Sequence, residues 1–269
     1  MPTNIKLADS VRARKEERDI LLMTHIVIGH PSFDEGMRIV EAMVEAGVEV
    51  MELQIPFSEP TADGPVILRA NQQSLDAGST VERCLQFAEE CARRFDIPFL
   101  LMTYYNILFK YGVDAFAQRM ADAGLCGAIV PDLPPEEADE YLAAMRSRSL
   151  APIFIYTPTT DDARMRLIAD AADGLVYCVA RRGVTGADTH FDQELDSYLA
   201  RCRAATDLPL ALGFGVKNRA DVDHLVGRAD LAVIGTQTIR LVEENGVEAV
   251  KPFIESLRAS NQDRGSALP

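Results

Sequence analysis

The chain has 269 residues, of which 48% are hydrophobic and 25% charged, and its formal net charge at pH 7 is −14. This composition is typical of a soluble globular protein, and the length fits one large α/β domain spanning residues 1–269. The negative charge argues against nucleic acid and anionic membrane surfaces as partners, because affinity for both comes from basic patches.

The cysteines and the first residues indicate a compartment. Five cysteines are scattered along the chain, and none forms a Cys-x-x-Cys pair or has a histidine neighbour at metal-ligand spacing. The first 18 residues are polar and charged, unlike a signal peptide, and no apolar run approaches the length of a membrane-spanning helix. These features predict a cytoplasmic protein with reduced thiols.

Strand-like apolar runs alternate with helical patterns along the chain. An amphipathic helix is expected at residues 7–18, before the first strand. Strands are predicted at residues 20–28, 48–55, 98–103, 127–130, 152–156, 175–180, 209–213 and 231–234. The clearest helical patterns between them lie at residues 33–46, 81–95, 113–123, 136–146, 161–171 and 220–226, and a short helix is expected to start near Thr236. The alternation predicts a (β/α)₈ barrel whose bottom is capped by the first helix; the competing architecture is a doubly wound open sheet.

Two segments depart from this repeat. Residues 64–78 make the second strand-to-helix connection unusually long, which predicts a functional loop with some structure of its own. Residues 260–269 are polar and are expected to form a frayed tail.

Two carboxylates stand close together in the sequence. Glu52 lies inside an apolar strand pattern, and Asp63 lies on the loop that follows Pro56. A glutamate near a strand's carboxyl end and an aspartate on the next loop can face one pocket, one for acid–base work and one for orientation. The alternative is a structural carboxylate at Glu52 and a turn residue at Asp63.

Glycine-rich turns follow the last predicted strands. Gly213-Phe214-Gly215 comes after the seventh strand and Gly235-Thr236 after the eighth. In barrels, these two loops often bind phosphate through backbone amides and the start of a short helix. The alternative is that both are tight turns that simply need small residues.

The segment after the sixth strand is also rich in glycine. Residues 181–189 contain Thr185 and Gly186 and few apolar anchors, which predicts a closing lid, with an ordinary surface loop as the alternative. Tyr104, Tyr177 and Phe214 lie at strand ends and fit either the walls of a pocket for a flat ring or the core.

In order and spacing, these motifs resemble the tryptophan synthase alpha subunit family, from about residue 9 to about residue 254. The resemblance implies a lyase of tryptophan biosynthesis that cleaves indole-3-glycerol phosphate to indole and glyceraldehyde 3-phosphate. It implies no metal or organic cofactor, and a tryptophan synthase β subunit as the partner.

The resemblance also implies roles for single residues. Glu52 corresponds to the general acid and base, and Asp63 to the carboxylate that accepts the indole N–H. Thr185 corresponds to the lid threonine that bonds this aspartate when the lid closes. The phosphate contacts implied by the family motif are Gly186, Gly215, Gly235 and Thr236.

Among the positions that depart from the family pattern, two concern the expected ring pocket. Gln54 stands where the family has glycine, on the same strand face as Glu52, and His25 stands where it has phenylalanine. Both are expected to line the ring pocket and to weaken binding of an apolar ring. They suggest one alternative, a diverged barrel aldolase or isomerase acting on another phosphorylated compound. A second alternative is a non-catalytic allosteric partner of a β-type subunit, although the two retained carboxylates argue against it.

Overall fold

The computed structural model describes residues 6–179, 193–213 and 215–258, and eight parallel strands in it close into a barrel in chain order. The last strand pairs with the first, so the sheet has no open edge. This confirms the predicted (β/α)₈ barrel over the doubly wound sheet. The strands are β1 (Leu21–Val27), β2 (Val50–Gln54), β3 (Phe99–Met102), β4 (Gly127–Ile129), β5 (Ala151–Tyr156), β6 (Val176–Val179), β7 (Leu210–Gly213) and β8 (Leu231–Ile234).

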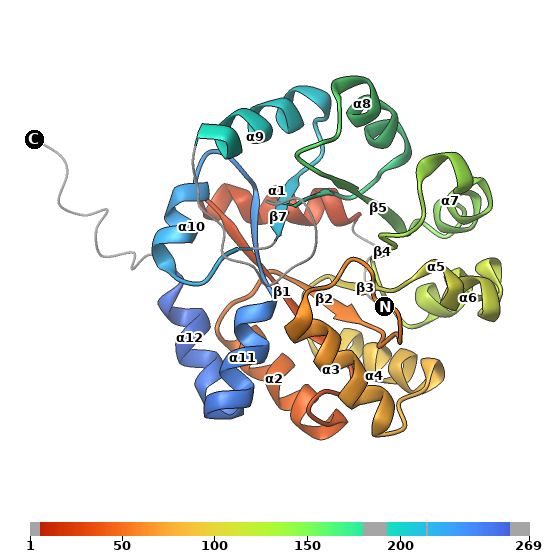
Figure 1. Ribbon diagram of the computed structural model, residues 1–269, viewed down its shortest axis with the longest axis vertical. Helices are drawn as coiled ribbons and strands as arrows, with labels where there is room; N and C mark the ends of the chain where they lie inside the picture. Colours follow the sequence, from red (N-terminus) through yellow and green to blue (C-terminus); the bar gives the residue numbers. More distant parts are fainter. Residues whose placement is uncertain (1–5, 180–192, 214, 259–269) are drawn as a thin grey trace, which may run out of the picture.

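Helices surround these strands (Figure 1). They are α1 (Leu7–Glu17), α2 (Phe33–Glu45), α3 (Pro65–Asp76), α4 (Val81–Arg94), α5 (Tyr105–Tyr111), α6 (Val113–Asp122), α7 (Asp139–Arg146), α8 (Asp162–Ala171), α9 (Gln193–Ala205), α10 (Arg219–Leu225), α11 (Thr236–Asn245) and α12 (Val250–Ser256), with 3₁₀ turns at Pro135–Glu137 and Val247–Ala249. The predicted helices all form, with ends within about three residues of the pattern.

Local sequence explains where several helices begin. Ser32, Thr80 and Asp161 each accept a hydrogen bond from a backbone N–H in the first turn of α2, α4 and α8. In the long second connection, Pro65 occupies the first turn of α3, directly after Gly64. The segment predicted as a functional loop is thus mostly a 12-residue helix, whose start presents Asp63 to the barrel.

The alternation of each strand divides the core into two layers. Outward side chains such as Leu22, Ile26 and Leu53 pack under the surrounding helices. Inward side chains fill the barrel, and α1 lies across its bottom, because Leu7 and Val11 join the same interior cluster as Leu21 and Leu175. The expected capping role of the first helix is therefore confirmed.

No helix in the described part of the chain is long and apolar enough to cross a membrane. All five cysteines are free thiols. Burial raises the pKa of Cys84 and Cys91 to about 12, so these two thiols resist ionisation.

Candidate active site

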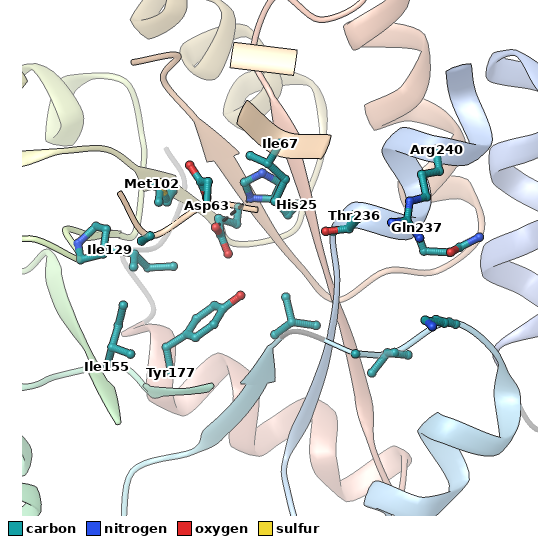
Figure 2. Close-up of a pocket in the computed structure, with 18 residues that line it drawn as sticks. His25, Asp63, Ile67, Met102, Ile129, Ile155, Tyr177, Thr236, Gln237 and Arg240 are labelled. Atoms are coloured by element: carbon teal, nitrogen blue, oxygen red, sulfur yellow. Dashed lines mark hydrogen bonds and ion pairs between the residues drawn. The ribbon is translucent and has the colours of Figure 1, made fainter. Parts of the chain in front are cut away.

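A pocket opens at the carboxyl ends of the strands, where barrel enzymes place their active sites. Figure 2 shows Tyr177 facing His25 and Asp63 across it, with Thr236 and Gln237 on the side of α11. Its lining is mostly apolar, with charged groups at intervals: His25, Glu52, Ala62, Asp63, Ile67, Met102, Ile129, Pro131, Ile155, Tyr177, Gly215, Val216, Lys217, Val233, Gly235, Thr236, Gln237 and Arg240.

Glu52 enters this pocket from β2. It is in register with His25 on β1, and neighbours on parallel strands point to the same face, so both side chains are directed into the barrel. Nδ1 of His25 lies 2.8 Å from Oε1 of Glu52, and each residue is 4% exposed. The second oxygen of Glu52, Oε2, has no hydrogen-bond partner in the described chain.

Asp63 reaches the pocket from the loop before α3. Its Oδ2 accepts hydrogen bonds from the Gln54 amide at 2.6 Å and from the Tyr104 hydroxyl at 3.1 Å. Burial raises the pKa of Asp63, while His25 and these two donors act in the opposite direction. The two donors fix the carboxylate through one oxygen, so Oδ1 is the oxygen available to a ligand.

The prediction that Gln54 lines the ring pocket is wrong. Gln54 is fully buried and absent from the lining, and its amide donates to Asp63 and, at 3.4 Å, to Asn71. An amide beside a buried carboxylate gains a charge-assisted hydrogen bond that it would lose by pointing toward an apolar ring. His25, in contrast, does line the pocket.

The strand-end tyrosines separate into two roles. Tyr104 is not a pocket wall. It is buried, its ring stacks on Phe57 with centroids 5.0 Å apart, and its hydroxyl donates to Asp63. Tyr177 is a wall, and burial raises its pKa well above the ordinary value, so its hydroxyl stays protonated. Gly213 on the next strand makes room for it, since a Cβ there would lie 2.4 Å from the Tyr177 ring.

Replacing Gly213 by alanine should therefore displace the Tyr177 ring. We expect a loss of about 1–3 kcal/mol in the free energy of unfolding, as for other overpacked cores, together with a higher KM for the substrate. Denaturant unfolding and steady-state kinetics on the purified variant measure the two effects. Wild-type values for both would contradict the close approach of Gly213 and Tyr177.

The opposite end of the pocket is suited to an anion. Gly215, Gly235 and Thr236, which the sequence suggested as phosphate contacts, line this end of the pocket. Helix α11 begins there without a side-chain cap. Its first hydrogen bond runs from the Thr238 N–H to the Gly235 carbonyl at 3.0 Å, which leaves the first amides of α11 available.

The neighbouring helix α10 offers no such site. Asn218 and Asp221 form a reciprocal capping box at its start. The Asp221 carboxylate also accepts the Lys217 N–H at 2.8 Å, so these amides already have an acidic partner. Of the two helices that follow the glycine turns, α11 is the one open to a ligand.

Sequence reasoning missed the charged residues at this end, Lys217 and Arg240. A signal for both was present in the sequence: Lys217 follows Gly215 by two residues, and Arg240 lies one helical turn beyond Thr236. They supply local positive charge in a protein whose overall charge is strongly negative.

Three predicted site residues, Thr185, Gly186 and Phe214, lie outside the described residues, as does the predicted lid.

The site combines a closed barrel, two buried carboxylates beside an apolar pocket, and an open helix start at the far end of that pocket. This combination defines a class of protein: a barrel enzyme for acid–base chemistry on a phosphorylated substrate with an apolar part. The family model described as tryptophan synthase alpha chain matches residues 11–264. The chain belongs to the tryptophan synthase alpha chain family.

Individual relatives agree with this assignment. A tryptophan synthase alpha chain of Syntrophotalea carbinolica is 63% identical over 252 residues, covering 94% of this chain and all of the relative. One of Desulforapulum autotrophicum is 60% identical, covering 92% of this chain and 98% of the relative. A solved structure of Mycobacterium tuberculosis tryptophan synthase superimposes with a TM-score of 0.88 at 31% identity, covering 93% and 96% of the two chains.

The protein is thus a carbon–carbon lyase of tryptophan biosynthesis, acting on indole-3-glycerol phosphate. Both relatives carry this name and are covered over 98% or more of their length. They therefore favour this activity over the two alternatives left open by the sequence, a diverged aldolase or isomerase and a non-catalytic paralogue.

Proposed function

We propose that Glu52 is the acid–base group of this lyase and that Asp63 stabilises the charge that forms on the indole ring. The observation that carries the proposal is the placement of both carboxylates on one apolar pocket, with Glu52 Oε2 left without a partner. An unpaired buried carboxylate oxygen is costly unless a ligand satisfies it.

Cleavage moves one proton from a hydroxyl group to a carbon. Glu52 protonates C3 of the indole ring, and the electron pair for the new C–H bond comes from the ring, whose nitrogen becomes positive. The glycerol hydroxyl on the adjacent carbon then returns a proton to Glu52 and becomes the aldehyde. The bond between the two carbons breaks, and its electrons restore the neutral indole. One carboxyl group can serve both steps in turn.

Asp63 acts on the ring nitrogen. Its Oδ1 accepts the indole N–H, and its negative charge opposes the positive charge that builds up when C3 is protonated. Because that charge is larger in the transition state than in the bound substrate, the interaction lowers the barrier. Gln54 and Tyr104 hold the carboxylate in place for this role.

The phosphate group of the substrate occupies the other end of the pocket. The amides near Gly215, Gly235 and the start of α11 receive its oxygens, with the hydroxyl of Thr236 as a further donor. Lys217 and Arg240 add charge. Gly186 completes the set proposed from the family motif.

Replacing Gly215 by valine should raise the KM for indole-3-glycerol phosphate by about tenfold or more, because the side chain blocks close backbone approach. The kcat should change much less. Gly36→Ala in α2 is the matched control, since its Cβ would meet Phe87 at an ordinary 3.5 Å, far from the pocket.

Crystals soaked in sulfate should show the anion beside Gly215 and Gly235; an anion bound elsewhere would contradict the assignment.

We further propose a tryptophan synthase β subunit as the partner and the cytoplasm as the compartment. A solved tryptophan synthase complex from Pyrococcus furiosus contains a chain with a TM-score of 0.81 at 28% identity, and it supports the partner. The free thiols support a reducing compartment. The chain is proposed to form one domain over residues 1–269.

The direct test is to incubate the purified protein with indole-3-glycerol phosphate, with and without a β subunit, and to assay indole and glyceraldehyde 3-phosphate. Equimolar products that depend on protein concentration support the proposal. No products under either condition would overturn it.

A further inference from the structure

The contact between His25 and Glu52 adds a second titratable group to the acid–base centre. The two side chains come from adjacent strands in fixed register, and Nδ1 and Oε1 are 2.8 Å apart. Both are almost completely buried, so water does not compete for this bond. The strands hold the pair rigidly, unlike an ion pair between long surface side chains.

The outer atoms of the pair have no protein partner. Nε2 of His25 and Oε2 of Glu52 are both buried and without hydrogen bonds in the described chain, and both residues line the pocket. The pair therefore uses its inner atoms to orient itself and leaves its outer atoms toward the ligand. Gly235 leaves room for His25, since a Cβ added at position 235 would lie only 3.3 Å from the Cβ of His25.

Charged groups surround the imidazole on several sides. Burial would lower the pKa of His25. The negative charge and hydrogen bond of Glu52, the charge of Asp63 and the nearby Gln54 side chain outweigh it and raise the pKa above 6.5. Tyr177 faces the pair from β6 as a neutral phenol, and the positive charges in the pocket, Lys217 and Arg240, stand near the phosphate end. The pair thus retains a proton at a pH where an isolated carboxyl group has lost it.

We propose that His25 is a positioning residue for Glu52 and that the two side chains hold one catalytic proton between them. This inference rests on the proposed role of Glu52. The proton passes from the pair through Glu52 Oε2 to C3 of the indole ring. The proton of the glycerol hydroxyl then returns to the pair, so its proton count is unchanged after each cleavage.

The pH profile of kcat/KM tests this role, because it reports the groups of the free enzyme. The wild-type alkaline limb should lie above pH 6.5, where the pair loses its proton. In His25→Phe, the imidazole that titrates above pH 6.5 is gone, so the alkaline limb should move away from its wild-type position. Phenylalanine is the family's residue here, so this variant should fold.

His25→Gln separates orientation from titration. Glutamine can still donate a hydrogen bond to Glu52 but holds no exchangeable charge. The alkaline limb of kcat/KM in His25→Gln should move as in His25→Phe. The kcat of His25→Gln at the low-pH optimum should stay closer to that of the wild type. An alkaline limb that stays in place in both variants would overturn the inference, because loss of packing alone lowers activity without shifting the limb.

An NMR titration of the four histidines gives a readout independent of activity. The His25 signal is assigned by its absence in His25→Gln. In Glu52→Gln its pKa should fall, since the main group that raises it is gone. An unchanged His25 pKa would refute the shared proton. If instead the wild type released no indole, or Glu52→Gln stayed active, the proposed function itself would fail.

Discussion

Replacing Glu52 by glutamine should reduce the rate of indole release by at least about 10²-fold, the lower end of the effect of a lost acid–base group. The glutamine oxygen can still accept a hydrogen bond from His25, so the strands and the pocket should keep their arrangement. The amide can neither hold nor return the proton that cleavage requires. The measurement is kcat and KM from indole formation, with the affinity for glyceraldehyde 3-phosphate as a check on binding.

Glu49, directly before β2, offers a matched control. It is a buried carboxylate at the other end of the barrel, where it accepts the Leu22 N–H at 2.8 Å and pairs with Arg18 and Arg258, each at 3.0 Å. Glu49→Gln should lower the free energy of unfolding and leave kcat near wild type. Near-normal turnover in Glu52→Gln would remove Glu52 from the mechanism.

Replacing Asp63 by asparagine should also reduce kcat by about 10²-fold or more, the size of effect seen when one electrostatic contact to a transition state is removed. The asparagine oxygen can accept both bonds from Gln54 and Tyr104, which places the NH₂ group where Oδ1 stood. That group donates and cannot accept the indole N–H, and the negative charge opposite the ring is lost. Single-turnover kinetics separate this loss of chemistry from any loss of binding.

Tyr104→Phe is the matched variant for Asp63, because it removes one donor and keeps the charge. The hydrogen bond from Tyr104 lowers the pKa of Asp63, so its removal should raise that pKa. Asp63 then stays protonated, and so neutral, up to a higher pH. The acid limb of kcat/KM should therefore move to higher pH, while the rate at pH values above this limb changes little. An acid limb that does not move in this variant would show that Asp63 does not set it.

Much of the fold was readable from local pattern. Continuous apolar runs identified each strand of the barrel, because these strands are buried on both faces. The helical patterns, including that of α1 as the lower cap, were identified by an apolar residue at about every third or fourth position. Four helices, α3, α5, α9 and α12, were not among the predicted ones. The segment that contains α3 was predicted as a long functional loop with some structure of its own, and Val66, Ile67 and Ala70 form the buried face of its helix.

Residue types and order in the sequence, together with the family resemblance, selected Glu52, Asp63 and the glycine turns as candidates, because the carboxyl ends of all the strands meet at one site in a barrel. The partners of those residues depended on the tertiary structure. Gln54 has the right parity to face the ring, yet it donates to Asp63, whose position is set by the loop that leads to α3. His25 meets Glu52 because β1 and β2 pair in one register. Such contacts join segments that no local period relates, so only the closed barrel determines them.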